Sequence, residues 1–456
     1  MNVSFLSDLL STISERGRSF VERLETRPPG EQRAAAVIEL AEALLSRRGE
    51  AAGVAIASEI LIAYAGLKSG PRIAVFEALA SRFGVDHARV GTALDAYRTN
   101  PGEEAAQALH LAAEPRRQEL FRRLNLAPAG TQSLVTLRRD LLGVLPRRPD
   151  LAVVDRDLNH LFSSWFNRGF LVVRRIDWTT PAHILEKIIR YEAVHEIGDW
   201  NDLRRRLEPP DRRCFAFFHP ALVDEPLIFV EVALTREIPG AIGPLLAPDR
   251  KPLPAAEATT AVFYSISNCQ EGLKGISFGN FLIKQVAEEL KRELPALDTF
   301  VTLSPVPGFA AWLERHLEGE ASPGLTREQR DVLLGALGDP GWAADPARTA
   351  DVNRAVLPAA AYYFLRAKTP GGRPVDPVAR FHLGNGARLE RLNPAGDLSP
   401  KGMRQSAGLM VNYLYDLDAI ERNHEAFADT GQVAASSGVT RALRADSPGR
   451  VVAPVS

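Results

Sequence analysis

Residues 258–304 read ATTAVFYSISNCQEGLKGISFGNFLIKQVAEELKRELPALDTFVTLS. A β-rich run, ATTAVFYSIS, is followed by a loop that contains glycines, by an amphipathic segment, FLIKQVAEELKREL, and by a second β-rich run, DTFVTLS. Two strands joined by one crossover helix run parallel, and their C-terminal ends share one edge of the sheet. The segment therefore predicts a strand–helix–strand unit inside a larger sheet.

Patterns upstream of residue 258 extend this sheet. Residues 169–178, GFLVVRRIDW, predict a strand, and residues 182–191, which follow Pro181, predict a helix. DLRRRL predicts a second short helix, and the runs RCFAFFHP and EPLIFVEVALT predict two strands that pair antiparallel across turn residues. The expected order is strand, two helices, three strands, helix, strand.

Downstream of residue 304 the pattern becomes helical again and then β-like. Residues 310–375 carry helical patterns broken by proline and glycine, and we interpret them as a helical insertion. The runs ARFHLGNGARLERLN and SAGLMVNYLYDLD are strand-like and close the domain. The tail after residue 431 is small and polar, and we expect it to fray.

The first third of the chain has only helical patterns. EQRAAAVIELAEALLSRRG places Ala35, Ile38, Ala41 and Leu44 on one face and charges on the other. Gly/Pro punctuation divides this part into short helices. The predicted fold class is α+β, with an all-helical bundle over residues 1–167, expected to serve assembly, and a mixed-sheet domain with its helical insertion over residues 168–456.

Length, charge and cysteine content exclude several classes of protein. The 456 residues imply two to four domains at about 100–200 residues each. A formal net charge of -1 leaves no excess of cations to neutralise phosphates, so we expect no nucleic-acid partner and no membrane partner. Cys214 and Cys269 are too few for a disulfide framework or a zinc site and are interpreted as buried thiols in a reducing compartment. With no clear presequence and no peroxisomal tripeptide, the expected location is cytoplasmic.

The glycine loop is the strongest single feature of the sequence. Glycines at 272, 275 and 279 let backbone N–H groups turn toward one point, and the start of the following helix adds unpaired donors and a partial positive charge. This arrangement favours a phosphate cradle, to which Lys274 and Lys284 could add charge. The spacing is neither that of a P-loop nor G-x-G-x-x-G, so a glycine-rich turn that only joins a strand to a helix stays open as an alternative.

Two side chains beyond the loop are candidates for chemistry. Ser304 ends the second strand, so we expect it at the same sheet edge as the glycine loop, where α/β sheets place ligands. Because a serine before a proline is also a common helix start, a capping role for Ser304 stays open. His382 ends a β-like run before a glycine turn and could transfer a proton near neutral pH, although a structural histidine fits the same spacing. His195 and His219 are interpreted as packing or turn residues.

Several motifs together resemble the malonyl-CoA decarboxylase family. The resemblance covers most of residues 150–420 and, more loosely, the helical N-terminal part. It implies an N-terminal helical domain through which the chain self-associates, as a homotetramer or homodimer, and a C-terminal domain with the GNAT acyltransferase fold. The segments that carry it, in the order of the family, are YEAVHEIGDWNDLRRRL, DRRCFAFFHPALVDEPLIFVEVALT, GLKGISFGNFLIK, LSPVPGF and FHLGNGARLERLN.

The resemblance also implies residues of the site. The catalytic serine and histidine of the family fall on Ser304 and His382, with the serine as proton acceptor and the histidine as donor, and a tyrosine near the site falls on Tyr415. Ser277 stands where some relatives carry a glutamate; if that carboxylate assists proton transfer there, another group or water must do so here. The stretch that holds CoA falls on Lys274, Gly275, Ile276, Ser277, Phe278, Gly279 and Asn280.

The activity that the resemblance implies is that of a carboxy-lyase. Malonyl-CoA, the expected substrate, is converted to acetyl-CoA and CO2 through a thioester enolate that an acid of the site protonates. We expect no metal, biotin or pyridoxal, because the thioester itself accepts the electrons and the sequence has no HExxH motif or carboxylate cluster. Two alternatives stay open: an acyltransferase that moves an acyl group from CoA to an amine, and an inactive sensor of acyl-CoA.

Overall fold

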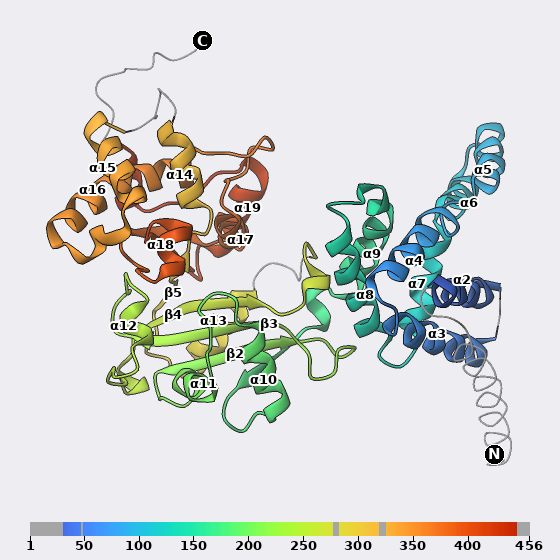
Figure 1. Ribbon diagram of the computed structural model, residues 1–456, viewed down its shortest axis with the longest axis horizontal. Coiled ribbons are helices and arrows are strands. Elements are labelled where there is room, and N and C mark those ends of the chain that lie inside the picture. Colours follow the sequence, from blue (N-terminus) through green and yellow to red (C-terminus); the bar gives the residue numbers. More distant parts are fainter. Residues whose placement is uncertain (1–30, 47–48, 277–281, 319–324, 445–456) are drawn as a thin grey trace, which may run out of the picture. The chain divides into compact units, whose positions relative to one another are not determined.

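The computed structural model describes residues 31–46, 49–276, 282–318 and 325–444 (Figure 1). The chain divides into two compact units, of which the second comprises Val172–Phe218, Glu225–Cys269 and Gly279–Ser456. The first comprises Met1–Leu171 and two segments from further along the chain, His219–Asp224 and Gln270–Phe278. The units therefore do not meet at a single point of the sequence, and the functional boundary expected at residue 167 stays a prediction.

The first unit is a helical bundle, as the apolar stripes predict. Leu44, Phe76, Phe121 and Leu134 have no exposed surface and form part of its core. Among the residues that the structure describes, α5 buries no side chain and α6 buries only Ala112. The helices are α2 (Glu31–Ser46), α3 (Glu50–Ala65), α4 (Ser69–Ser81), α5 (His87–Thr99), α6 (Glu103–Ala113), α7 (Arg116–Asn125), α8 (Gly130–Val144), η1 (Pro149–Leu151), α9 (Ala152–Trp165), η2 (Arg168–Phe170) and η4 (Glu271–Leu273).

One detail of the predicted stripe on α2 is wrong. The buried face includes Ala34, Val37, Ala41 and Leu44, while Ala35 is exposed. Three consecutive alanines allow two neighbouring stripes with the same helical period, and only packing against the other helices selects between them.

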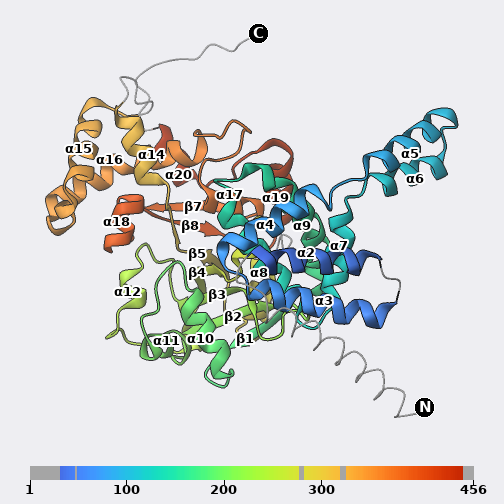
Figure 2. The ribbon, with the colours of Figure 1, turned by 45° about the vertical axis from the view of Figure 1, so that its right-hand side comes forward.

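The second unit is built on a mixed eight-stranded sheet. Its order is β1-β2-β3-β4-β5-β8-β6, with β7 paired to β8 (Figure 2). β1 to β4 are antiparallel neighbours, and β4 and β5, joined through α13, are parallel as predicted. The strands are β1 (Val172–Ile176), β2 (Arg212–Phe218), β3 (Pro226–Thr235), β4 (Thr260–Asn268), β5 (Thr299–Thr302), β6 (Ser304–Pro305), β7 (Arg388–Asn393) and β8 (Met410–Leu414).

The predicted order of elements is confirmed. Apart from the short helices α12 and η3 between β3 and β4 and η4 before α13, which the sequence analysis does not predict, the chain runs through β1, two helices, β2 to β4, a helix and β5. This is the order that the resemblance to the GNAT fold implies. The fold class is thus α+β, with a helical N-terminal region followed by a mixed-sheet domain. The helices of this part are α10 (Ala182–Tyr191), α11 (Trp200–Leu207), α12 (Gly243–Leu246), η3 (Ala255–Glu257) and α13 (Leu282–Glu293).

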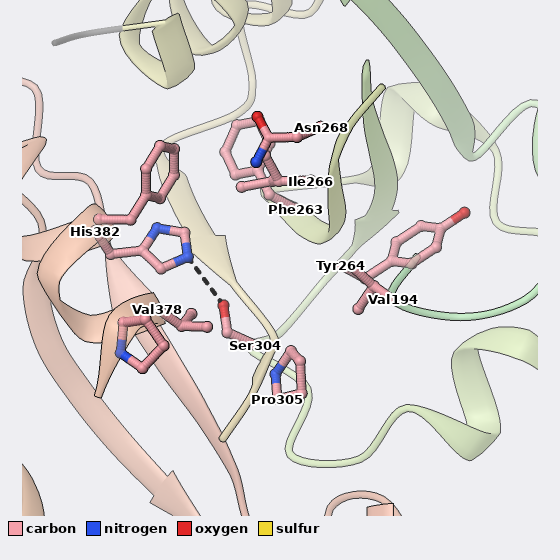
Figure 3. Close-up of a pocket in the computed structure, with 11 residues that line it drawn as sticks. Val194, Phe263, Tyr264, Ile266, Asn268, Ser304, Pro305, Val378 and His382 are labelled. Atoms are coloured by element: carbon pink, nitrogen blue, oxygen red, sulfur yellow. Dashed lines mark hydrogen bonds between the residues drawn. The ribbon is translucent and has the colours of Figure 1, made fainter. Parts of the chain in front are cut away.

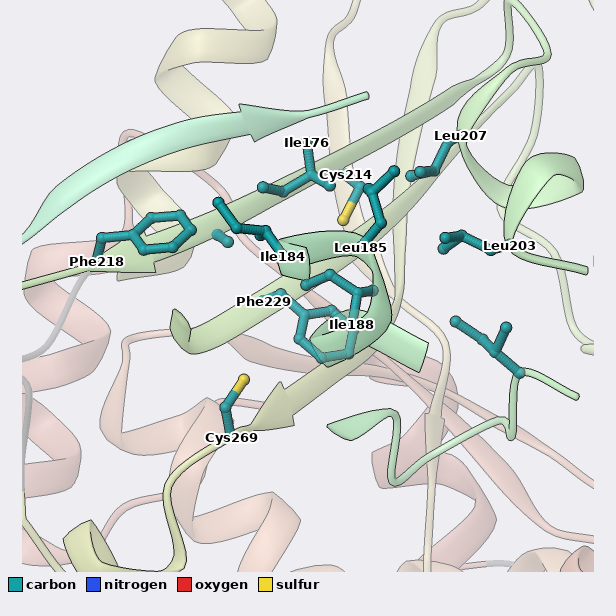
Figure 4. Packing of buried hydrophobic residues seen from close by; sticks show 12 residues of the cluster. Ile176, Ile184, Leu185, Ile188, Leu203, Leu207, Cys214, Phe218, Phe229 and Cys269 are labelled. Carbon is teal, nitrogen blue, oxygen red and sulfur yellow. The ribbon is translucent and has the colours of Figure 1, made fainter. Parts of the chain in front are cut away.

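Helices cover both faces of the sheet. Side chains alternate along each strand, so a strand that is buried throughout, such as β2, presents side chains to the helices on each face. On one face of β2, Cys214 and Phe218 pack in a cluster with Ile184 and Ile188 of α10 and with leucines of α11 (Figure 4). On the other face, Arg213 forms an ion pair of 2.7 Å with Glu293 at the end of α13. Cys214 and Cys269 both belong to the cluster with α10 and α11. They are buried thiols, as predicted, and burial raises their pKa values.

Residues 310–375 are largely helical, as predicted, but two expectations about the chain after them are wrong. Residues 377–384 form a helix rather than a strand, because Asp376 caps it by accepting the Ala379 N–H at 2.7 Å and Pro377 starts it. The described part of the tail does not fray: its helix packs on α16 and β7 and buries Val439. The remaining elements are α14 (Phe309–Glu318), α15 (Arg327–Gly338), η5 (Pro340–Ala344), α16 (Pro346–Leu365), α17 (Pro377–Gly384), α18 (Pro400–Ser406), α19 (Ile420–Thr430) and α20 (Ser437–Arg444).

Candidate active site

A pocket of about 240 Å³ opens in the second unit beside β4, β6 and α17 (Figure 3). Most of its wall is apolar, and a few polar side chains face into it, as is usual for sites that bind small molecules. Its lining is Val194, Phe263, Tyr264, Ile266, Asn268, Ser304, Pro305, Pro377, Val378, Phe381 and His382.

A β-bulge on β4 shapes one side of this pocket. The register between β3 and β4 shifts by one residue at Tyr264, so the alternation of side chains along β4 reverses there. Beyond the bulge, Ile266 and Asn268 line the pocket, while Ser265 and Ser267 are buried on the opposite face. The bulge therefore determines which of the two alternating sets of side chains beyond it faces the pocket.

Ser304 lies just after the end of β5, where the chain begins the next strand of the sheet. It begins the two-residue strand β6, pairs with Val411 of β8, and is 6% exposed. Its hydroxyl donates to Oγ1 of Thr302 at 2.8 Å and lies 3.2 Å from Nε2 of His382. The alternative that Ser304 caps a helix is wrong, because α14 begins only at Phe309.

His382 comes from the last turn of α17 and is 3% exposed. Its ring stacks on that of Tyr413, with centroids 4.5 Å apart and planes 24° apart. Its Nδ1 lies 2.8 Å from the hydroxyl of Tyr415, and its Nε2 faces Ser304 across the pocket wall (Figure 3). The ring is thus held on one side by stacking and at both nitrogens by hydrogen bonds.

Burial keeps this row of groups uncharged. It lowers the pKa of His382 to about 3 and raises the pKa of Tyr415 well above its usual value, so the imidazole is neutral and the phenol keeps its proton near neutral pH. Because Ser304 already donates to Thr302, its Oγ accepts the proton of His382 Nε2, and Nδ1 accepts the hydroxyl proton of Tyr415. The donors therefore run in one direction, from Tyr415 through His382 and Ser304 to Thr302.

The structure thus brings together Ser304, His382 and Tyr415, the three candidate residues of the sequence analysis. It adds Thr302, which accepts from both Ser304 and the Tyr413 N–H (3.1 Å), and the ring of Tyr413. The sequence contains a signal for both residues. Thr302 stands two residues before Ser304, and Tyr413 stands two residues before Tyr415, each pair on a β-rich run. Residues i and i+2 of a strand share a face, so each pair is expected on one side of the sheet.

Family models identify the chain. The model of the malonyl-CoA decarboxylase C-terminal domain matches residues 169–452, and the model of the N-terminal domain matches residues 83–166. The chain belongs to the malonyl-CoA decarboxylase family. The two models together span most of the described residues of both units, so the family resemblance of the sequence motifs is confirmed.

Relatives from distant organisms support membership of the malonyl-CoA decarboxylase family. A mitochondrial malonyl-CoA decarboxylase of Anser anser anser is 34% identical over 466 residues, which cover 94% of this chain and 89% of the relative. The crystal structure of a malonyl-CoA decarboxylase from Rhodopseudomonas palustris is 60% identical, with a TM-score of 0.87 and coverage of 91% of this chain and 100% of that one. A third, from Cupriavidus metallidurans, is 36% identical with a TM-score of 0.70, covering 90% and 100%.

The stretch expected to hold CoA is described only in part. Lys274, Gly275 and Ile276 lie in the first unit, within Gln270–Phe278, whereas Ser277, Phe278, Gly279 and Asn280 lie outside the described residues. Gly275 has a φ of +80° and nothing within 4 Å of the place where a β-carbon would stand. Its backbone therefore has the left-handed conformation and the open surroundings that a close ligand contact needs. The expected proximity of this stretch to Ser304 stays a prediction.

Other candidate residues take structural positions. His219 is a turn residue, because its Nδ1 accepts the Ala221 N–H at 3.1 Å and its Nε2 lies 3.0 Å from the Trp165 carbonyl. Lys284 forms an ion pair of 2.9 Å with Glu421. Within the ranges that the structure describes, no three His, Cys, Asp or Glu side chains are grouped as a metal site requires. In the same ranges, no helix is both long and apolar enough to cross a bilayer.

Proposed function

We propose that this chain decarboxylates malonyl-CoA to acetyl-CoA and CO2, with Ser304 and His382 as catalytic residues and Tyr415 as the residue that positions His382. One observation carries the proposal. In a member of the malonyl-CoA decarboxylase family, a hydrogen-bonded row from Tyr415 through His382 to Ser304 ends at the wall of a largely apolar pocket. Such a row places one hydroxyl and one imidazole ring within reach of the same bound molecule.

The reaction needs little more than donors and orientation. When the bond between the α-carbon and the carboxylate breaks, CO2 leaves and the bonding electrons enter the thioester, which becomes the enolate of acetyl-CoA. That bond must stand perpendicular to the thioester plane so that it overlaps the carbonyl π system. One preorganised donor that meets the developing oxygen charge is typically worth about 2.7–4 kcal/mol. The Nε2–H of His382 and the Ser304 hydroxyl, which can rotate away from Thr302, are such donors.

The enolate must then gain a proton at its α-carbon, and His382 is the group placed to supply it. In the ligand-free site, burial lowers the pKa of this ring to about 3. A malonyl carboxylate in the pocket adds negative charge beside the ring and raises that pKa, so the ring can hold the proton that it delivers. Tyr415 can accept from Nδ1 as well as donate to it, because a phenol does both. Each turnover consumes one proton from solvent.

The remote part of the substrate is expected to supply orientation. We assign the CoA diphosphate to residues 274–280, where glycine backbone approaches closely and a helix start follows. Support among the described residues is the left-handed, unobstructed Gly275 beside the exposed Lys274. Binding energy from the nucleotide can then be used to hold the malonyl group in the reactive geometry.

The remaining assignments concern domains, assembly, cofactors and location. We assign residues 1–167 to self-association, as a homotetramer or homodimer, and residues 168–456 to catalysis. The α5–α6 pair supports this, because it contributes almost nothing to the core of its own unit and exposes half of Leu111. We expect the reaction to proceed without metal, biotin or pyridoxal, and the protein to act in the cytoplasm.

Incubation of the purified chain with malonyl-CoA and no amine tests the proposal. We expect CO2 and acetyl-CoA in equal amounts, and strongly reduced turnover for Ser304→Ala and His382→Ala. His160→Ala, at an exposed histidine on α9, is the matched control and should leave turnover unchanged. A product that requires an added amine would indicate an acyltransferase, and binding of malonyl-CoA without turnover would indicate a sensor. Either result overturns the proposal.

A further inference from the structure

Arg138 on α8 holds the turn that precedes the expected CoA-binding residues. Its side chain is 2% exposed, and all the contacts lie within the first unit. Its Nη1 donates to the carbonyls of Gly272 at 2.8 Å and Lys274 at 3.0 Å, while its Nε donates to the carboxylate of Asp155 at 2.7 Å. A guanidinium donates through several N–H groups in a fixed plane, so an anchor at Nε fixes where the other donors point.

These two bonds complete the hydrogen bonding of the turn. The carbonyls of residues 270, 271 and 273 accept from backbone N–H groups three residues further on, at 2.9 to 3.0 Å. The carbonyls of Gly272 and Lys274 are the two that accept from Arg138. All five consecutive carbonyls from residue 270 to residue 274 are therefore engaged, and one buried side chain from a distant helix supplies the last two.

Gly272 shows how closely the turn approaches α8. A β-carbon at this position would stand 1.9 Å from the carbonyl oxygen of Val135, which is far inside contact distance. Only glycine therefore lets the turn come close enough for Arg138 to reach its carbonyls. The contact between the turn and α8 thus requires both the missing side chain of Gly272 and the long side chain of Arg138.

The orientation of one amide follows from the bond to Lys274. In a trans peptide the carbonyl and the next N–H point in opposite directions. Since the Lys274 carbonyl points to Arg138, the Gly275 N–H points away from Arg138, at the residue whose φ of +80° and open surroundings suit ligand contact. Without Arg138, this peptide plane could rotate and turn its oxygen outward, where it would repel an anion.

We infer that Arg138 is a positioning residue for CoA esters: by holding the Gly272 and Lys274 carbonyls, it aims the Gly275 amide at a phosphate of the nucleotide. The inference rests on the proposed function for the assignment of residues 274–280. It predicts an effect that depends on the nucleotide part of the substrate and not on the malonyl group.

Steady-state kinetics of Arg138→Met on two substrates test this. One substrate is malonyl-CoA, and the other is malonyl-N-acetylcysteamine, which carries the same thioester without the nucleotide. We expect KM for malonyl-CoA to rise about tenfold, the equivalent of about 1.4 kcal/mol, with kcat within about twofold. kcat/KM for the truncated thioester should not change, and Arg138→Lys should recover part of the loss.

Two further variants serve as a control and as a substitute for Arg138→Met. Arg139→Met changes the next residue of α8, a half-exposed arginine paired with Asp140, and should behave as wild type on both substrates. If Arg138→Met fails to fold, Asp155→Asn loosens the same guanidinium and should raise KM for malonyl-CoA alone. Equal loss on both substrates, or no loss on either, overturns the inference. Titration with CoA itself separates it from the proposed function, since a weaker Kd in the variant stands even if the wild type does not decarboxylate.

Discussion

Replacing Tyr415 by phenylalanine tests whether the phenol orients His382. The substitution removes a buried oxygen, the partner of Nδ1 at 2.8 Å, and leaves the ring in place. Tyr413, on β8 two residues before Tyr415, provides a matched control. It is equally buried and its ring stacks on His382, but its hydroxyl has no hydrogen-bond partner among the described residues.

The expected size of the effect follows from what each hydroxyl contacts. A buried polar group left without its partner costs about 1–3 kcal/mol, so Tyr415→Phe should lower the free energy of unfolding by that amount. If the same contact also orients the ring in the transition state, kcat should fall by about 5- to 140-fold, at about 1.4 kcal/mol per factor of ten. Tyr413→Phe removes a hydroxyl with no described partner and should leave kcat within about twofold and stability equal or slightly higher.

Both quantities are measured on the same preparations. Release of CO2 gives kcat and KM, and urea unfolding gives the free energy of unfolding. We expect KM to stay constant in Tyr415→Phe, because the phenol does not line the pocket. A Tyr415→Phe enzyme with the kcat of the wild type, or equal losses in the two variants, would refute the assignment of Tyr415 as the residue that orients His382.

Three further predictions concern the acid, the pH and the loop. His382→Ala should lower kcat about 100-fold or more while the Kd of CoA stays nearly constant, as expected for a lost general acid; an equal loss in both would make it a binding residue. The unfolded chain gains a proton on His382 near pH 6.5, while the folded protein gains it only near pH 3. Through this window His382 should therefore lower the free energy of unfolding by about 1.4 kcal/mol per unit as the pH drops. In urea titrations the slope should be steeper by that amount in the wild type than in His382→Gln, where His195, whose pKa burial lowers to about 4, still contributes. Gly275→Val forces a β-branched residue to a φ of +80° and should weaken binding of malonyl-CoA, acetyl-CoA and CoA alike in titrations; an effect on the malonyl ester alone would contradict the phosphate assignment.

The fold was predictable where local pattern determines structure. The helix at 182–191 has the predicted bounds, because Pro181 marks its start and its apolar residues recur with the helical period. The parallel pairing of β4 and β5 followed from one crossover helix, which requires only neighbouring segments. The β-like run around His382 predicts a strand, although Asp376 and Pro377 carry the signature of a helix start, and the helix is what forms.

The site depended on contacts that no local pattern contains. Spacing alone favours a helix cap over a catalytic hydroxyl for Ser304, and the contact that points to the second role is with a histidine 78 residues away. The contact of the glycine turn with α8 likewise joins distant parts of the chain, because Arg138 and Val135 lie more than 130 residues before the turn. Long-range contacts of this kind can be inferred from a single sequence through a family resemblance, as for Tyr415.

The bulge at Tyr264 has a consequence for length variation in the chain. Side chains alternate strictly along β4 on either side of it, so one extra residue exchanges the two sets beyond that point. Tyr264 is the extra residue, because Phe263 pairs with Val232 and Ser265 pairs with Glu231. Deleting it would leave a regular ladder with the same pairs, so Ser265 and Ser267 would still donate to the buried Glu192 carboxylate and Ile266 and Asn268 would still line the pocket. Deleting one residue beyond the bulge, with the bulge kept, would instead move every later side chain of β4 to the other face.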